Sequence, residues 1–267
     1  MSSLTITTIQ SNIFWEDKAA NLKMFEEKIL SINEPTEVVV LPEMFTTGFI
    51  QQPEHLAETM EGSTINWMKS ISSEKNIILT GSIIIKENEQ YFNRLIWMLP
   101  NGQMGIYDKR HLFSFGGESE YFTSGKKRLI ASVKGWKINL QICYDLRFPC
   151  WARQEVKNKE PEYDILINVA NWPEKRIHHW KTLLQARAIE NLSYVIGVNR
   201  VAVDGNTILY NGNTAVIDPL GNYLYEKTIA EDIFTITLKK ENLQHIRDRY
   251  HFLDDADKFQ IIGESQY

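Results

Sequence analysis

The sequence holds a cysteine, a glutamate and a lysine that together could act on one carbonyl group. Cys143 is one of two cysteines in 267 residues, and a thiol becomes a strong nucleophile when a base takes its proton. A carboxylate such as Glu43 can be that base and later pass the proton to a leaving amine. A cation such as Lys109, with the backbone N–H of Tyr144, can stabilise the charge that develops on the carbonyl oxygen. These residue types suit the hydrolysis of an amide.

Each of these three side chains comes just after a segment with the pattern of a β-strand. The segments that precede Glu43, Lys109 and Cys143 are 37–41, 103–107 and 136–142. Sites in open α/β sheets gather beyond the carboxyl ends of strands, so we expect the three side chains to share a pocket. Taken singly, the cysteine could be inert core and the two charged residues could be solvated.

The remaining pattern indicates how such strands are held together. Strands are expected at 4–9, 37–41, 77–85, 92–99, 103–107, 129–133, 136–142, 165–169, 194–198 and 233–238, with two late strands joined by the turn 218–222. Helices are expected from a cap at residue 17, from a cap at residue 63 or 64, near residue 149 and over 180–188. The pair 134–135 predicts a hairpin turn. Strands outnumber helices, which favours two packed sheets covered by helices, and no linker divides residues 1–267, which we interpret as a single domain.

Composition restricts the partners. The chain carries 29 Lys and Arg against 34 Asp and Glu, for a net charge of −5. It has no concentrated basic stripe, so we expect no nucleic-acid partner. Two cysteines make neither a disulfide framework nor a four-ligand zinc site, and we expect no metal. The first residues lack a signal-peptide pattern and no apolar run approaches the ~20 residues that cross a bilayer, so we expect a cytoplasmic protein without a membrane partner.

Three strings resemble the signatures of the nitrilase, or carbon–nitrogen hydrolase, superfamily in its order. They are residues 41–45 (LPEMF), 107–113 (YDKRHLF) and 142–149 (ICYDLRFP). A fourth stretch, formed by 170–173 (ANWP), 179–180 (HW) and 185–191 (QARAIEN), is also similar to the family. The likeness spans about residues 4 to 240, nearly the whole chain.

The resemblance implies a four-layer αββα sandwich that assembles through its helices as a homodimer or larger homo-oligomer, without cofactor. It implies that Glu43 is the general base, that Lys109 stabilises the transition state and that Cys143 forms a thioester. Family members carry a second glutamate in the loop after the lysine. Glu118 fits that position better than Glu120, and we expect it to orient Lys109 or the substrate.

Within the superfamily, the Trp-Pro pair at 172–173 and the string 144–149 look like those of ω-amidases. These enzymes release ammonia from the terminal amide of a small 2-oxo dicarboxylic acid monoamide. Such a substrate carries a carboxylate, which Arg147 or Arg176 could bind, although either arginine could instead pair with an acid such as Asp145. Trp172 could form a wall of the pocket or belong to the core.

Three alternatives remain open on the sequence alone. The chain could be another amidase of the superfamily, acting on N-carbamoyl or aliphatic amides. It could be a hydrolase of the Cys–His type, in which His111 or His179 pairs with Cys143. It could also be a binding module that keeps the fold without catalysis, although the presence of all three reactive residue types favours an enzyme.

Overall fold

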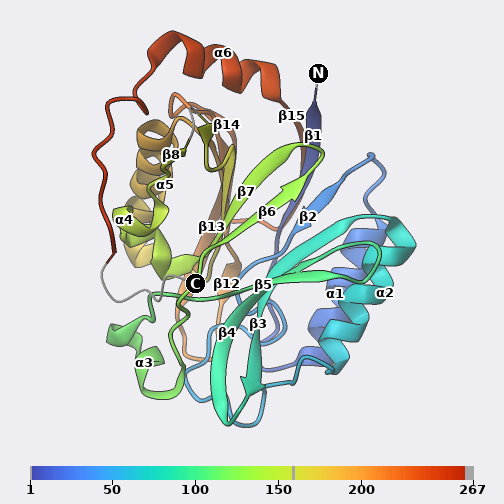
Figure 1. Ribbon diagram of the computed structural model, residues 1–267. Coiled ribbons are helices and arrows are strands. Elements are labelled where there is room, and N and C mark those ends of the chain that lie inside the picture. The colour runs from blue at the N-terminus through green and yellow to red at the C-terminus, as the bar shows by residue number, and fades with distance from the viewer. Residues whose placement is uncertain (1, 158–159, 262–267) are drawn as a thin grey trace.

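Two β-sheets lie face to face in the middle of the molecule, and helices cover both outer faces (Figure 1). The computed structural model describes residues 2–157 and 160–261. Within these residues, the first sheet has six strands in the order β15-β1-β2-β3-β4-β5, and the second has β12-β13-β11-β10-β7-β6 with β14 paired to β13. Helices α1 and α2 pack on the first sheet, and α4 and α5 on the second. The predicted αββα sandwich is therefore confirmed.

The first sheet and its helices come mainly from the first half of the chain. Their bounds are β1 Ser3–Gln10, α1 Lys18–Leu30, β2 Val38–Val40, α2 Ser63–Lys75, β3 Ile78–Glu87, β4 Gln90–Met98, β5 Met104–Asp108 and, from the far end of the chain, β15 Asp232–Lys239. Two short helical segments follow β5, η1 Ser114–Gly116 and α3 Glu118–Tyr121. Strands β1, β2 and β3 run parallel, and β15 closes the edge antiparallel to β1.

The second sheet is formed by later segments. These are β6 Leu129–Val133, β7 Trp136–Ile142, β10 Ile165–Val169, β11 Tyr194–Val198, β12 Val201–Val203, β13 Leu209–Ile217 and β14 Tyr223–Thr228. The helical segments are η2 Cys143–Arg147, α4 Pro149–Ala152, η3 Glu174–Arg176, α5 Ile177–Asn191 and α6 Lys240–Tyr250. Two further short strands, β8 Val156–Lys157 and β9 Glu160–Pro161, pair antiparallel apart from the two main sheets. Strands β7, β10 and β11 are parallel at its centre.

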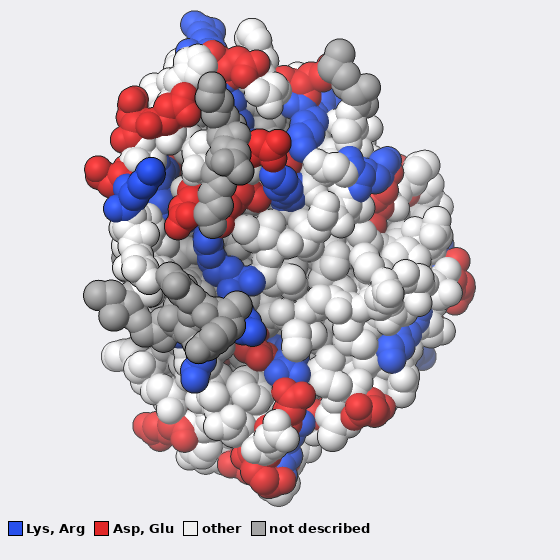
Figure 2. All heavy atoms as spheres, in the orientation of Figure 1, with Lys and Arg blue, Asp and Glu red and all other residues white. Residues whose placement is uncertain are grey.

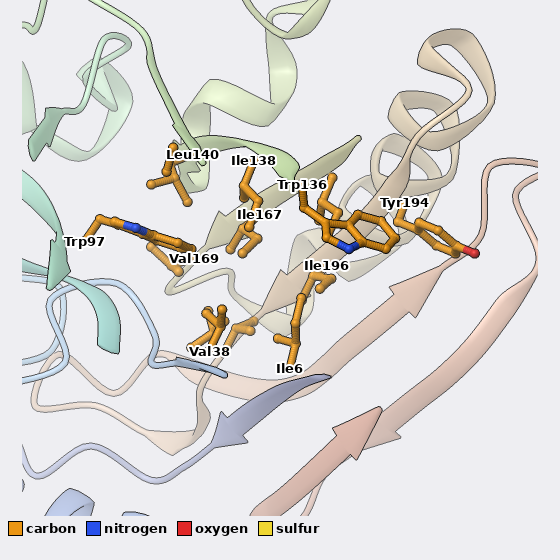
Figure 3. Close-up of a cluster of buried hydrophobic side chains, with 14 of the residues drawn as sticks. Ile6, Val38, Trp97, Trp136, Ile138, Leu140, Ile167, Val169, Tyr194 and Ile196 are labelled. Carbon is orange, nitrogen blue, oxygen red and sulfur yellow. The ribbon is translucent and has the colours of Figure 1, made fainter. Parts of the chain in front are cut away.

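The main core lies between the two sheets. Figure 3 shows Ile6 and Val38 of the first sheet facing Ile138, Ile167 and Ile196 of the second, and all five are fully buried. Every residue of β2 and β10 is buried because one face meets the other sheet and the opposite face meets a helix. This double burial explains the unbroken apolar runs in the sequence.

The two predicted helix caps have different outcomes. Asp17 caps α1 as predicted, since its Oδ1 accepts the backbone N–H of Ala20 at 3.0 Å. The predicted cap at Ser63 or Thr64 is wrong, because Gly62 occupies the cap position of α2. Thr64 N and the Ser63 hydroxyl each donate to the Glu58 carboxylate at 3.0 Å. A carboxylate at the positive end of the helix therefore replaces the capping hydroxyl.

The turns show what the sequence pattern could and could not place. The predicted hairpin turn is confirmed at Lys134 and Gly135, whose φ values are +49° and +79°. A second tight turn, at Asn88 and Glu89, joins β3 to β4, so these strands extend further than predicted. Helix α6 was missed although Leu243, Ile246 and Tyr250 recur at helical spacing, and Leu243 is its one buried residue in the described structure.

The outside of the molecule is mixed in charge. On the face shown in Figure 2, Lys and Arg side chains lie among Asp and Glu around a broad uncharged area. Within the described residues, no helix combines the length and the apolar character that spanning a bilayer requires.

We propose that the two sheets unfold as one domain, since their largest core cluster is shared between them. Ile167→Ala should lower the free energy of unfolding by about 2–5 kcal/mol, the cost of a buried truncation. Far-ultraviolet circular dichroism and tryptophan fluorescence, followed in urea, should report one coincident transition. Ile229→Ala is the matched control, because Ile229 is 77% exposed, and it should change stability by less than about 0.5 kcal/mol. Two separate transitions would contradict the proposal.

Candidate active site

Strand ends from both sheets bring the predicted side chains together. Lys109 Nζ donates to Glu43 Oε1 at 2.9 Å, and both side chains are completely buried. Cys143 follows β7, and its Sγ lies 4.0 Å from the carbonyl oxygen of Asn171, whose N–H donates to Glu43. Cys143 and Lys109 line the same pocket. The carboxylate, the ammonium and the thiol that the sequence placed after three strands thus lie in one site, although β2, β5 and β7 are far apart in the chain.

Glu118 completes a buried cluster of charges. Lys109 Nζ donates to Glu118 Oε2 at 2.8 Å and to Oε1 at 3.0 Å, and the Phe113 N–H donates to Oε2 at 2.6 Å. Of the two glutamates considered from the sequence, Glu118 is fully buried beside the lysine and Glu120 is exposed. Burial lowers the pKa of Lys109, but the charges of Glu118 and Glu43 outweigh that effect and raise the pKa well above its ordinary value.

The backbone around Lys109 is fixed on both sides. Its N–H donates to the Asn93 carbonyl at 3.0 Å and its carbonyl accepts the Gly125 N–H at 2.9 Å. A Cβ at Gly125 would lie 2.0 Å from the Asp108 carbonyl oxygen, so only glycine permits this approach. The loop that carries Glu118 therefore returns to contact the end of β5.

Two asparagines belong to the site although the sequence gave them no role. The Asn171 N–H donates to Glu43 Oε2 at 2.8 Å, and Asn171 Nδ2 donates to the Glu43 carbonyl at 2.7 Å. Asn93 Nδ2 donates to Glu43 Oε1 at 2.9 Å and to Glu118 Oε1 at 3.2 Å. Asn171 lies within the motif 170–173, but nothing in the pattern of a strand distinguishes Asn93 from a solvent-facing polar residue.

The reactive cysteine predicted from the sequence lies on a sharp turn. Cys143 has φ +44°, a conformation that is rare for residues other than glycine, and it begins the 3-10 turn η2. Arg187 of α5 donates through Nη2 to the Leu146 carbonyl at 2.5 Å, which holds the far end of that turn. Tyr144 is the second residue of the turn, where a backbone N–H has no acceptor within it, so this donor can face a substrate oxygen.

The thiol is held in its protonated form. Burial raises the pKa of Cys143 well above its ordinary value, and the Glu43 charge and a hydrogen bond to Glu43 raise it further, while Lys109 opposes the rise. A protonated thiol needs a base to take its proton during attack, and Glu43 is the candidate base that the sequence singled out.

A pocket opens in front of Cys143, and its walls are aromatic and cationic. Its lining includes Phe49, Phe113, Tyr144, Trp172, Arg147, Arg176, Asn206, Ile208 and Tyr210. Trp172 is both wall and core, since it is 2% exposed and packs on Trp180 with ring centroids 5.4 Å apart. The aromatic surfaces would shield a small substrate from water and strengthen electrostatic contacts with it.

Both predicted arginines face this pocket, and neither forms an ion pair with a carboxylate within the described residues. Arg147 lies over the Trp172 ring at 4.7 Å, and Arg176 lies over the Phe113 ring at 5.2 Å. Burial lowers the pKa of Arg147, and the nearby Arg176 cation adds to the decrease. Two neighbouring guanidinium groups without an ion-pair partner in the described structure have the chemistry to bind an anionic group.

Neither histidine considered as a partner of Cys143 takes that place. His111 Nδ1 lies 2.8 Å from Asp145 Oδ1, and its ring stacks on Phe148 at 3.7 Å. His179 Nδ1 lies 3.1 Å from Arg147 Nη2. Asp145 also accepts the Tyr107 hydroxyl at 2.7 Å, so the alternative of Asp145 as an acidic partner of the arginines is wrong.

Comparison with known proteins identifies the family. Residues 5–248 match the carbon-nitrogen hydrolase family, and the chain belongs to it. It is 39% identical to "Omega-amidase YafV" of Yersinia enterocolitica over 98% of this chain and 100% of that protein. It is 31% identical to the "2-oxoglutaramate amidase" of Bacillus subtilis over 95% and 98% of the two chains.

The solved structures agree with this assignment. The crystal structure of XC1258 from Xanthomonas campestris, described as a CN-hydrolase superfamily protein with an arsenic adduct in the active site, superposes with a TM-score of 0.95. Its sequence is 40% identical, with 98% of this chain and 100% of that chain covered. The chain is thus a hydrolase of carbon–nitrogen bonds other than peptide bonds.

Glu43→Gln should make the Cys143 thiol easier to deprotonate and should nevertheless slow amide hydrolysis. Loss of the Glu43 charge should lower the Cys143 pKa, because that charge raises it in the native protein. Loss of the base should slow amide hydrolysis by about 10²–10⁴-fold. Iodoacetamide alkylation followed against pH would measure the first effect, in a Cys150→Ser background because Cys150 is exposed. A thiol pKa that stays the same or rises would contradict this description of the site.

Proposed function

We propose that the chain is an ω-amidase that hydrolyses the terminal amide of a short 2-oxo dicarboxylic acid monoamide and releases ammonia. The observation that carries this proposal is the pair Arg147 and Arg176, which lines the pocket in front of Cys143 without acidic partners in the described structure. The names of the relatives, ω-amidase and 2-oxoglutaramate amidase, support the same substrate class.

In the proposed reaction, the amide carbon lies beside the Cys143 sulfur. Glu43 Oε2 takes the thiol proton as the sulfur–carbon bond forms, and then gives it to the amide nitrogen as the carbon–nitrogen bond breaks. Ammonia leaves and the acyl group remains on the sulfur as a thioester. Water then attacks the thioester, giving its proton to Glu43, and the sulfur leaves and regains the proton.

The oxygen that becomes negative in both steps needs donors fixed in advance. We assign this role to Lys109 and to the Tyr144 backbone N–H, because both residues line the same pocket as Cys143. Glu118 supports Lys109, because its two oxygens accept two of the ammonium hydrogens and keep that charge beside the sulfur. Charge stabilisation of this kind is worth about 10²–10³-fold in rate for each donor.

We further propose a cytoplasmic setting and a homodimer or larger homo-oligomer, without a cofactor and without a nucleic-acid or membrane partner. Both cysteines are free thiols, which suits a reducing compartment. Light scattering on the purified protein would test the assembly state.

A panel of amides separates the candidate substrates. We expect ammonia release to be fastest from 2-oxoglutaramate or 2-oxosuccinamate, slower from succinamate, and slowest from an N-carbamoyl amino acid, a simple aliphatic amide and a nitrile. If the 2-oxo acid amides were no better than the aliphatic amide, the chain would be another amidase of the family.

Removal of either proposed anchor of the substrate carboxylate, Arg147 or Arg176, should weaken substrate binding. Arg147→Met and Arg176→Met should each raise KM for 2-oxoglutaramate by about 10–100-fold, since a hydrogen-bonded charge contributes about 1.5–3 kcal/mol. The rate with an uncharged amide should change less than threefold, or about 0.65 kcal/mol. Lys175→Met, a nearby exposed cation, is the matched control. Equal losses with charged and uncharged amides would contradict the assignment.

A further inference from the structure

Asn93 lies at the centre of the buried charge cluster and has no assigned role. It comes from β4, is 0% exposed, and is paired across the sheet with Ile84 of β3. Its Nδ2 group donates to Glu43 at 2.9 Å and Glu118 at 3.2 Å, and its backbone carbonyl accepts the Lys109 N–H. One side chain therefore contacts both carboxylates of the cluster, and its main chain contacts the lysine between them.

The orientation of this amide is dictated by its neighbours. A flipped amide would direct Oδ1 at two carboxylates, which offer no hydrogen for it to accept. With Nδ2 toward the carboxylates, Oδ1 is buried and has no partner within the described residues. A buried unpaired carbonyl oxygen is costly. In return for this unpaired oxygen, the two N–H groups of Nδ2 donate to the two glutamates.

The donors divide unequally among the carboxylate oxygens. Oε1 of Glu43 accepts from Lys109 and Asn93, and Oε1 of Glu118 accepts from the same two groups. Oε2 of Glu118 accepts from Lys109 and the Phe113 N–H. Oε2 of Glu43 has a single backbone donor, the Asn171 N–H. This last oxygen retains the capacity to accept the thiol proton.

We infer that Asn93 is a positioning residue that occupies the Oε1 atoms of Glu43 and Glu118, and thereby directs Oε2 of Glu43 to the thiol as the base. The inference deepens the proposed function and rests on it. Lys109 has three ammonium hydrogens, and its Nζ lies within hydrogen-bonding distance of three glutamate oxygens, Glu43 Oε1 and both oxygens of Glu118. When one hydrogen turns to the substrate oxygen, Asn93 still satisfies the carboxylate oxygen that Lys109 leaves.

The inference predicts a change in rate and in pH dependence rather than in substrate binding. Asn93→Ala should lower kcat by about 10–100-fold with KM within threefold, as expected for the loss of hydrogen bonds to charged groups. The acid limb of kcat/KM should move up by about one pH unit, because the carboxylates lose donors that favour their charged form. Asn93→Ser, which keeps one donor hydrogen, should give an intermediate kcat.

Asn139→Ala is the matched control. Asn139 is a buried asparagine on β7 that contacts no member of the cluster, so its truncation should change stability without moving the pH profile. Wild-type kcat and pH profile in Asn93→Ala, or a loss confined to KM, would overturn the inference. If the alanine variant did not fold, a wild-type profile in Asn93→Ser would overturn it equally.

The same variants separate this inference from the proposed function. The profiles can be measured with whichever amide the wild type hydrolyses, so a different substrate preference would sink the ω-amidase proposal alone. Should the wild type hydrolyse no amide, alkylation of Cys143 by iodoacetamide against pH, in the Cys150→Ser background, would still test Asn93. The pH profile of Cys143 alkylation should move to higher pH in Asn93→Ala and should stay in place in Asn139→Ala. Coincident profiles would overturn the inference.

Discussion

The site depends on one buried ammonium that lies between two buried carboxylates. Lys109 Nζ is within 3.0 Å of both Glu43 and Glu118, and none of the three side chains reaches solvent. Loss of one partner from a buried ion pair typically costs about 3–5 kcal/mol, because the remaining charge is left unpaired. The cluster is therefore stable only when complete. Burial and the nearby Glu43 charge raise the pKa of the Cys143 thiol, while Lys109 opposes the rise. The proposed mechanism therefore starts from a thiol that passes its proton to Glu43.

This constraint explains why the site lies where the two sheets meet. Glu43 and Lys109 follow strands of the first sheet, whereas Cys143 and Asn171 follow strands of the second. Asn171 crosses between the sheets to hold the Glu43 carboxylate and main chain. Asp145 also links the two sheets, since its carboxylate accepts hydrogen bonds from the Tyr107 hydroxyl of β5 and from the Ile142 N–H of β7. The nucleophile and the charges are thus fixed relative to each other by both halves of the sandwich.

Sequence reasoning reached the parts of this arrangement that leave a local pattern. Apolar runs marked the doubly buried strands, and the order of the motifs gave the family, which the family match confirms. It missed features set by contacts distant in the chain. Glu58, and not Ser63, accepts the backbone hydrogen bond at the N-terminus of α2. A β-bridge between Glu58 and Ile85 of β3 places the carboxylate beside that helix end. Asn93 resembles any polar residue of a strand until the fold buries it between two glutamates. Helix α6 is a different case, because the helical spacing of Leu243, Ile246 and Tyr250 was a local signal that went unused.

The most direct test of the account is the intact mass of the protein during turnover. Wild-type protein mixed with excess 2-oxoglutaramate and quenched in acid within milliseconds should carry one added acyl group, equal to the substrate less ammonia, and peptide mapping should locate it on Cys143. The Cys143→Ala variant should bind the same substrate and gain no mass. An unmodified Cys143 during rapid turnover, or hydrolysis that persists in Cys143→Ala, would contradict the account.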